Sequence, residues 1–314
     1  MKMAMYLYFV VASLAATHGA ESCSVEDVTA FWAKLGMTEE SARASKSLSL
    51  SGMSAEEVLV FAHIISMGTL SSLEVLKVEK AALDADNTAI LATALGTPGR
   101  LGGLRELTFT WCNIDDDGVV KLATEIGRGN TPGLRVLRLM SNPFGQNAEG
   151  VAALAAGLSS GAPNLDTLSL PSNLITSAGA QALAAAITDG SFGLIKSLYL
   201  HKNHIGDSGL IALSDAIAAG GLAKLDMWYL GDNKYGDTAF MAFGAALENA
   251  LALPSLTTLN LSSLKLTDAG WVAFTTAIGN GALASLKSIR IMDKQPHVQL
   301  KAACAARGIV LDLQ

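Results

Sequence analysis

The chain has 314 residues, of which 50% are hydrophobic and only 16% are charged. This composition excludes an intrinsically disordered protein, because disordered segments combine few hydrophobic residues with many charges. The net charge of −6 leaves no surplus of lysine and arginine to neutralise phosphates, so we expect no nucleic-acid partner.

The first 20 residues have the pattern of a secretory signal peptide. One lysine precedes a largely apolar run over residues 3–16, and small or polar residues follow. That run is shorter than the roughly 20 residues of a membrane span but has the length of a signal-peptide core. We predict a signal peptide over 1–20, no membrane span after its cleavage, and a secreted protein or one in the lumen of the secretory pathway. The alternative for this segment is a short uncleaved anchor or a buried first helix. The alternative location of the protein is the cytoplasm.

The cysteine content sets a limit on this interpretation. Three cysteines, Cys23, Cys112 and Cys304, lie far apart in the sequence, which excludes a dense disulfide framework. Either the core is large enough to be stable without disulfides, or the chain stays in the secretory lumen.

Residues 21–44 are expected to form an N-terminal helical cap. The spacing Ser24-x-x-Asp27 is that of a capping box and predicts a helix that runs to about Leu35. A second box that starts at Ser54 predicts another helix, which ends near a glycine.

A single pattern, L-x-x-L-x-L-x-x-N, recurs over residues 45–295 at intervals of 28 to 31 residues. Its alternating apolar residues predict a short strand with one buried face, and the apolar stretch that follows, such as AQALAAAI from Ala180, has helical spacing. One strand and one helix per unit cannot bury their hydrophobic faces alone, so the units must stack. The copies begin at Ser45, Leu73, Leu104, Leu134, Leu165, Ile195, Leu225, Leu256 and Leu286.

Two polar or small positions recur between each strand and its helix. An asparagine amide directly after the strand is expected to satisfy backbone groups of the bend. A small residue further on is expected to let the helix lie close against the strand. The asparagines are Asn142, Asn173, Asn203 and Asn233, and the small residues are Gly118, Gly150, Gly179, Gly209, Ala239 and Gly270.

These repeats make residues 45–314 resemble leucine-rich repeat proteins of the ribonuclease-inhibitor-like type, which have a full helix in every repeat. That type permits cysteine at the asparagine position, as at Cys112, whereas Ala81, Leu264 and Lys294 depart from it. The resemblance implies an α/β leucine-rich-repeat solenoid, or horseshoe, of about nine repeats of ~30 residues. A concave parallel β-sheet and convex α-helices are expected, in an architecture used for protein binding and seldom for catalysis.

Residues 296–314 are expected to close the other end of the solenoid. The segment from His297 predicts a helix that stops at Gly308, and the apolar residues up to Leu313 predict a final edge strand.

Motifs that suggest catalysis or metal binding fit the repeat better. The G-x-S-x-G motif at residues 157–161 precedes a predicted strand, whereas a hydrolase nucleophile follows one. The calcium-loop spacing of Asn113, Asp115 and Asp117 lacks the glutamate at position 12, which is Thr124. We therefore expect no catalytic residues, no metal and no cofactor, and hence no enzyme.

The residues between the core leucines are expected to point outward from the strands and to form the concave surface. Tyrosine, tryptophan and arginine often dominate binding energies, because they combine a large rigid area with a polar group. Scattered surface aromatics are the alternative interpretation, and Trp228, at a leucine position, is expected in the core. The predicted partner-binding residues form one cluster of Tyr199, His201, Lys202, Tyr229 and Asp232 and a second of Trp111, Arg138 and Met140.

Asn260 opens the one N-x-S/T sequence of the chain. A lumenal route would permit a glycan there, although Asn260 lies on a predicted concave strand rather than on a loop.

The sequence thus predicts a non-catalytic, monomeric module that binds another protein or peptide on its concave face within the secretory pathway. The first alternative is a cytosolic regulator that resembles the Ran-GTPase-activating proteins or the repeat region of NOD-like receptors. The second is an enzyme on the same scaffold.

Overall fold

The computed structural model describes residues 23–292 and 298–313. Strands and helices alternate along most of this chain. The strands are β1 (Ser47–Ser51), β2 (Val75–Glu79), β3 (Glu106–Thr110), β4 (Val136–Arg138), β5 (Thr167–Ser169), β6 (Ser197–Tyr199), β7 (Met227–Tyr229), β8 (Thr258–Asn260), β9 (Ser288–Ile291) and β10 (Val310–Leu313). The helices are α2 (Val25–Lys34), α3 (Glu39–Ala44), α4 (Ala55–Met67), α5 (Ala85–Leu95), α6 (Asp116–Gly127), α7 (Ala148–Gly161), α8 (Ser177–Thr188), α9 (Asp207–Ala218), α10 (Asp237–Leu247), α11 (Asp268–Gly279) and α12 (Val298–Ala306).

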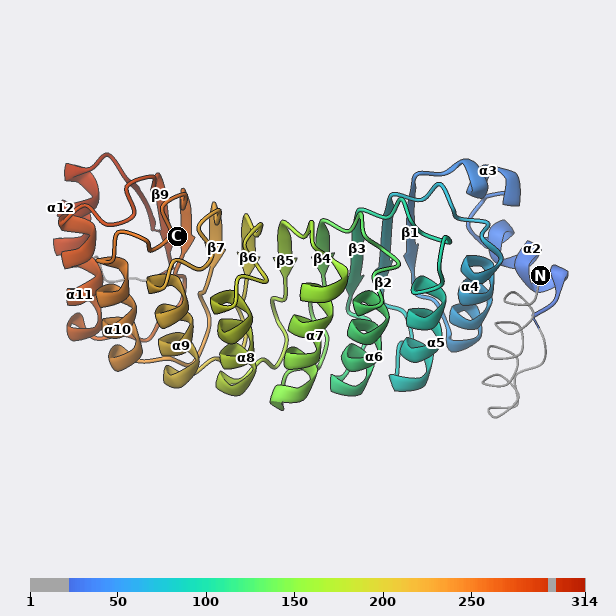
Figure 1. Cartoon of the computed structure of the whole chain (residues 1–314), viewed down its shortest axis with the longest axis horizontal. Helices are drawn as coiled ribbons and strands as arrows, with labels where there is room; N and C mark the ends of the chain where they lie inside the picture. The colour runs from blue at the N-terminus through green and yellow to red at the C-terminus, as the bar shows by residue number, and fades with distance from the viewer. Residues whose placement is uncertain (1–22, 293–297, 314) are drawn as a thin grey trace.

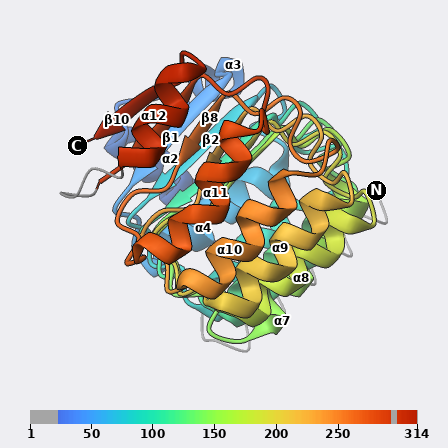
Figure 2. The ribbon, with the colours of Figure 1, turned by 90° about the vertical axis from the view of Figure 1, so that its left-hand side faces the viewer.

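All the strands pair in parallel in one ten-stranded sheet whose spatial order follows the chain from β1 to β10. Figure 1 shows the units as one row from the N-terminal to the C-terminal end, with a helix beside each strand. In the view along this row, helices α7 to α11 line one side of the molecule (Figure 2). The predicted α/β leucine-rich-repeat horseshoe is confirmed.

The core lies between the sheet and the helices and runs without a break from Phe31 to Ile309. Two apolar residues of each strand frame point into it, and both Leu168 and Leu170 are fully buried. Trp228 is also fully buried at a leucine position, as expected, and its ring packs edge-on against Phe243 at a centroid distance of 5.8 Å. Burial of these side chains is the main favourable term for a stack of units that are unstable alone.

The recurrent glycines permit close packing between neighbouring helices. A Cβ atom at Gly150 would lie 2.3 Å from the Asp116 carboxylate in the first turn of α6, and one at Gly270 would lie 2.4 Å from Asp237 in α10. The expectation that these glycines bring a helix close to its own strand is therefore wrong for these two. The first turn of the preceding helix comes so close at these positions that only a residue without a side chain fits.

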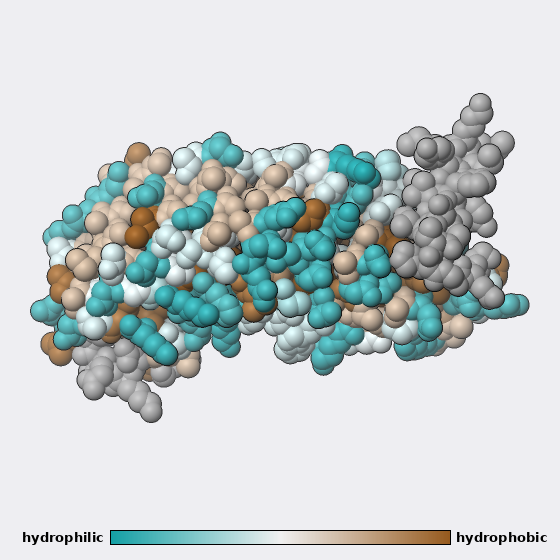
Figure 3. Space-filling view, turned by 90° about the horizontal axis from the view of Figure 1, so that it is seen from below, coloured by the Kyte–Doolittle hydropathy of each residue, from teal (hydrophilic) through white to brown (hydrophobic). Residues whose placement is uncertain are grey.

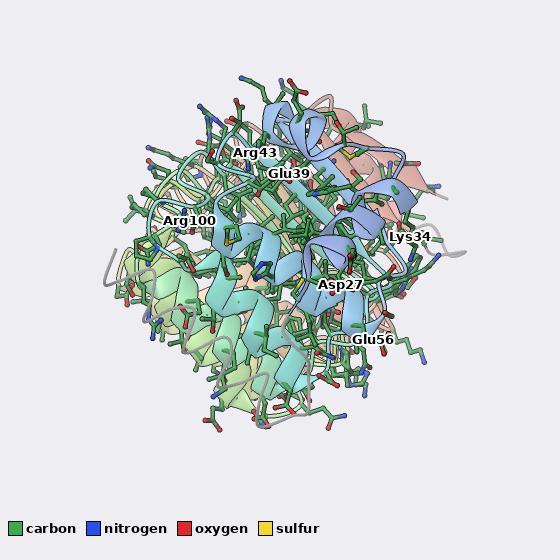
Figure 4. The ribbon with its side chains drawn as sticks, turned by 90° about the vertical axis from the view of Figure 1, so that its right-hand side faces the viewer. Asp27, Lys34, Glu39, Arg43, Glu56 and Arg100 are labelled. Carbon is green, nitrogen blue, oxygen red and sulfur yellow. The ribbon has the colours of Figure 1, made fainter. Side chains whose placement is uncertain are left out.

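Helices α2 and α3 lie at the N-terminal end of the solenoid, as the view of that end shows (Figure 4). The hydroxyl of Ser24 accepts a hydrogen bond from the amide of Asp27, and α2 starts directly after this cap. Phe31 of α2 stacks on Phe61 of α4 at 5.8 Å. Helix α3 was not expected, and its cap is the hydroxyl of Thr38.

At the other end, β10 pairs with β9 and continues the sheet. The predicted signal peptide over 1–20 lies outside the described residues, as does Lys294. Within the ranges that the structure describes, none of the helices has the length and apolar character that a membrane crossing demands.

Side-chain amides close the bend after each central strand. Asn142 is only 2% exposed. Its Oδ1 accepts hydrogen bonds from the amides of Cys112 at 3.0 Å and Ile114 at 3.2 Å. Its Nδ2 donates to the carbonyl oxygen of Phe109 at 3.1 Å. One side chain thus satisfies three backbone groups of the preceding repeat that have no water to bond.

The same arrangement recurs along the row. The Oδ1 atoms of Asn173, Asn203 and Asn233 accept from the amides of Asn142, Ile175 and Ile205 respectively, at 2.7 to 3.1 Å. At the position of Cys112, the buried thiol donates to the carbonyl of Val78 at 3.4 Å. Burial raises the pKa of this thiol, so that it remains protonated and can donate.

We expect Asn142→Ala to lower the free energy of unfolding by about 3 kcal/mol or more, because three buried backbone groups lose their partner and each such loss costs about 1–3 kcal/mol. Urea denaturation measures this loss. Asn164→Ala is the matched control, since its exposed amide makes one bond, to the carbonyl of Pro132, and we expect a loss below about 1 kcal/mol. Equal losses in the two variants would contradict this account of the bend.

Candidate binding surface on the concave sheet

Three aromatic rings come together on the outer face of β6 and β7. The register of the two strands places Tyr199 directly opposite Tyr229. Their ring centroids lie 4.9 Å apart, and the ring of His201 lies 5.6 Å from Tyr229 and 6.4 Å from Tyr199. All three side chains are partly exposed. We call Tyr199, His201 and Tyr229 the ring cluster; such rings attract one another beyond their area of burial.

His201 is held as a neutral side chain within the ring cluster. Burial lowers its pKa, and the ammonium of Lys202 lowers it further, while the carboxylate of Asp232 acts in the opposite direction. Its Nδ1 is buried and bonds to none of the described residues.

Lys202 and Asp232 lie at the bends that follow β6 and β7. Both have left-handed backbone conformations, with φ of 56° and 54°. A residue other than glycine is strained there by about 1–2 kcal/mol. The amide of Lys202 donates to the carbonyl of Gly231 at 3.0 Å, which extends the pairing of the strands and offsets this cost.

The same left-handed position recurs in most repeats, and sequence analysis did not detect it. No single residue type marks it, and only its place directly before the asparagine position of the repeat identifies it. The residues are Lys80, Trp111, Ser141, Ser172, Lys202, Asp232 and Ser263.

The second predicted cluster has different contacts from those expected. Trp111 is 53% exposed, and the ammonium of Lys80 lies 5.4 Å from the centre of its ring, within cation–π range. Arg138 pairs instead with Glu106 at 2.7 Å. Met140 is half-buried, and its carbonyl accepts a hydrogen bond from the Trp111 amide. Trp111 therefore contacts Lys80 and Arg138 contacts Glu106, and no ion pair or cation–π contact joins Trp111 and Arg138 in the described part of the chain.

Glu106 and Lys80 were not among the predicted site residues. Glu106 is the first residue of β3, and the position before the first core leucine of a strand also points outward. Applying the two-residue period in both directions from that leucine would have identified it.

Asn260 is only 8% exposed. Its Oδ1 accepts a hydrogen bond from the amide of Ser262 at 3.0 Å. A glycan on Nδ2 would require this side chain to turn away from the sheet.

The residues of the rejected motifs have structural roles. Asp115 caps α6 by accepting a hydrogen bond from the amide of Gly118 at 2.9 Å. Residues 157–161 form the last turns of α7, away from any strand-to-helix turn. In the described part of the chain, histidine, cysteine, aspartate and glutamate form no group of three or more that could hold a metal.

The face of the molecule seen from below mixes hydrophilic and hydrophobic residues (Figure 3). Hydrophilic residues gather over its middle, and the most hydrophobic residues appear as isolated spots (Figure 3). Single exposed apolar residues of this kind are ordinary on protein surfaces.

A match to a known family agrees with this architecture. A family model described as "Leucine Rich repeat" matches residues 104–123 and 194–214. The chain carries leucine-rich repeats. No curated protein matches the sequence.

Solved structures similar to this leucine-rich-repeat chain are distant in sequence. The TLR13–ssRNA13 complex is 16% identical with a TM-score of 0.48, over 89% of this chain and 37% of that one. InlP of Listeria monocytogenes is 13% identical with a TM-score of 0.40, over 81% and 58%. The ectodomain of the Arabidopsis thaliana receptor kinase GASSHO1/SCHENGEN3 is 16% identical with a TM-score of 0.38, over 86% and 32%. The match thus spans less than two thirds of each of these chains.

We expect the stability of the protein to fall as the pH drops below about 6.5, the ordinary pKa of histidine. The pKa of His201 is lower in the folded state, so the unfolded state takes up its proton first; the stabilisation is present above about pH 6.5 and is lost below it. Melting temperatures at about pH 7.5 and 5.5 measure the effect.

His201→Gln should reduce this fall in melting temperature. Part of the fall should remain, because burial also lowers the pKa of His63. The exposed His204→Gln is the control, and an equal fall in wild type and His201→Gln would show that His201 contributes nothing.

Proposed function

We propose that the chain is a non-catalytic module that binds another protein or peptide on its concave sheet. The observation that supports this most strongly is the ring cluster. The rings of Tyr199 and Tyr229 contact each other on the surface of the sheet. Neither ring belongs to the buried core, which other residues fill. Rigid aromatic groups of this kind contribute much of the binding energy of protein interfaces.

The size of the sheet fits a macromolecular partner. Ten parallel strands spaced about 4.8 Å apart give a surface roughly 43 Å long. Short strands and tight bends present backbone and side chains on a rigid frame, which limits the entropy lost on binding.

We expect the double variant Tyr199→Ala, Tyr229→Ala to lose its partner while remaining folded. Loss of two aromatic contacts of about 2 kcal/mol each should weaken binding by roughly several hundredfold. The measurement is quantitative mass spectrometry of proteins cross-linked to the tagged full chain in an extract of its native source, followed by titration of the purified partner.

The control reverses two exposed charges on the helices, Lys121→Asp and Glu149→Lys, which leaves the net charge unchanged. A partner that binds wild type, this control and the tyrosine variant equally would rule out the ring cluster as the binding site.

We also propose the ribonuclease-inhibitor-like type for these repeats. What supports it is a full helix in each central unit, from the 11 residues of α5 and α10 to the 14 residues of α7. The long helices hold successive units apart on the outer side, which curves the sheet toward its concave face.

Entry into the secretory pathway is proposed on the sequence of residues 1–20. We expect N-terminal sequencing and intact mass of the protein from its native source to show a start near Ala20. An intact Met1 in a cytosolic fraction would contradict this and favour the cytosolic regulator instead. The same spectrum tests for a glycan at Asn260.

A further inference from the structure

We propose that the partner of the concave sheet contacts it through a segment of mixed charge, in which an acidic side chain pairs with Lys202 and a basic side chain pairs with Asp232. This inference rests on the proposed function and names the chemistry of the partner at the same site.

Most charged side chains on the concave sheet are already paired within the protein. Glu106 accepts from Arg138 at 2.7 Å and lies 3.4 Å from Lys77. At the C-terminal edge, Arg290 pairs with Asp312 at 2.9 Å. A partner gains little from such groups, because it would have to compete with an existing ion pair.

Lys202 and Asp232 differ from these residues. Neither side chain makes an ion pair or a hydrogen bond with any residue of the described ranges, 23–292 and 298–313. They lie at neighbouring bends, since the amide of Lys202 donates to the carbonyl of Gly231, the residue before Asp232. Two opposite charges at adjacent bends that do not pair with each other remain available to a partner.

Both charges lie beside the ring cluster. The electrostatic effects of Lys202 and of Asp232 both reach His201, whose ring contacts Tyr229. A partner that covers the tyrosines would therefore also remove water from around the two charges. Removing water strengthens an ion pair across the interface and penalises a charge left alone.

This geometry favours a segment with both signs over a purely acidic or purely basic one. A partner of one sign would satisfy one of the two groups and leave the other unpaired and partly desolvated, which is unfavourable. Neighbouring strands are about 4.8 Å apart, a spacing that an acidic and a basic side chain can match three or four residues apart on a helix.

Two further polar atoms mark the same region. The Nδ1 of His201 and the Oγ of Ser262 are buried without a hydrogen-bond partner in the described part of the chain. Their two residues belong to the repeats on either side of Gly231, since the amide of Lys202 donates to Gly231 and the amide of Asp232 donates to the carbonyl of Ser262 at 2.8 Å. Unsatisfied buried polar atoms are rare, and here they flank the two free charges.

The test uses a displayed library of random dodecapeptides as the probe, selected on the full wild-type chain. We expect enriched peptides to carry an acidic and a basic residue at a fixed spacing near an apolar or aromatic residue. One enriched peptide is then synthesised together with a second form in which its acidic and basic residues are exchanged.

We expect wild type to prefer the first peptide at least tenfold. The double reversal Lys202→Asp, Asp232→Lys should prefer the exchanged form, and Asp232→Asn should weaken the first peptide without such a switch. The control Lys121→Asp, Glu149→Lys should bind both as wild type does. Circular dichroism melting checks the fold of each variant; if the reversal unfolds, the weaker binding of Asp232→Asn carries the test.

The outcomes separate this inference from the proposed function. The inference would be overturned, and the function would stand, if the peptides fail to bind the variant Tyr199→Ala, Tyr229→Ala but show no charge preference. The same holds if their binding does not respond to Asp232→Asn. A library with no enriched peptide, or with peptides that bind the tyrosine variant equally well, would overturn both.

Discussion

The solenoid depends on the hydrogen bonds that close the bend after each strand. The backbone at this bend is buried and cannot bond to water, so each unsatisfied amide or carbonyl there would cost about 1–3 kcal/mol. The side-chain amide of Asn142 satisfies backbone groups of the preceding repeat. The backbone amide of Asn142 in turn donates a hydrogen bond to the side chain of Asn173 in the next repeat. Each repeat thus completes the hydrogen bonding of its neighbour, and the units are stable only as a stack.

The same bend also shapes the proposed binding surface. The residue directly before the asparagine position takes a left-handed conformation, as at Lys202 and Asp232. That conformation brings these charged side chains to the end of the strand next to the ring cluster. The feature that holds the core together therefore also places the free charges, and the strain at these residues is offset by hydrogen bonds to the next repeat.

Much of the fold could be predicted because the repeat is so regular. The strand positions, the inward direction of Trp228 and the cap at Ser24 all follow from local spacing. Helix α3 was missed because its six residues are too few to show a helical period. The helix-to-helix contacts of Gly150 were missed because the sequence shows that a small residue recurs, but not which neighbour requires it.

The sequence by itself determined the architecture and the list of residues on the concave face, because a period of two in the strands and a period of about 30 in the chain decide which side chains point inward. Only the tertiary structure decided how those residues associate. The register of neighbouring strands brings Tyr199 and Tyr229 together, pairs Arg138 with Glu106, and leaves Lys202 and Asp232 without a partner among the described residues. The physical reason is that these contacts join residues about 30 positions apart, and their distances depend on how the repeats stack rather than on any local pattern.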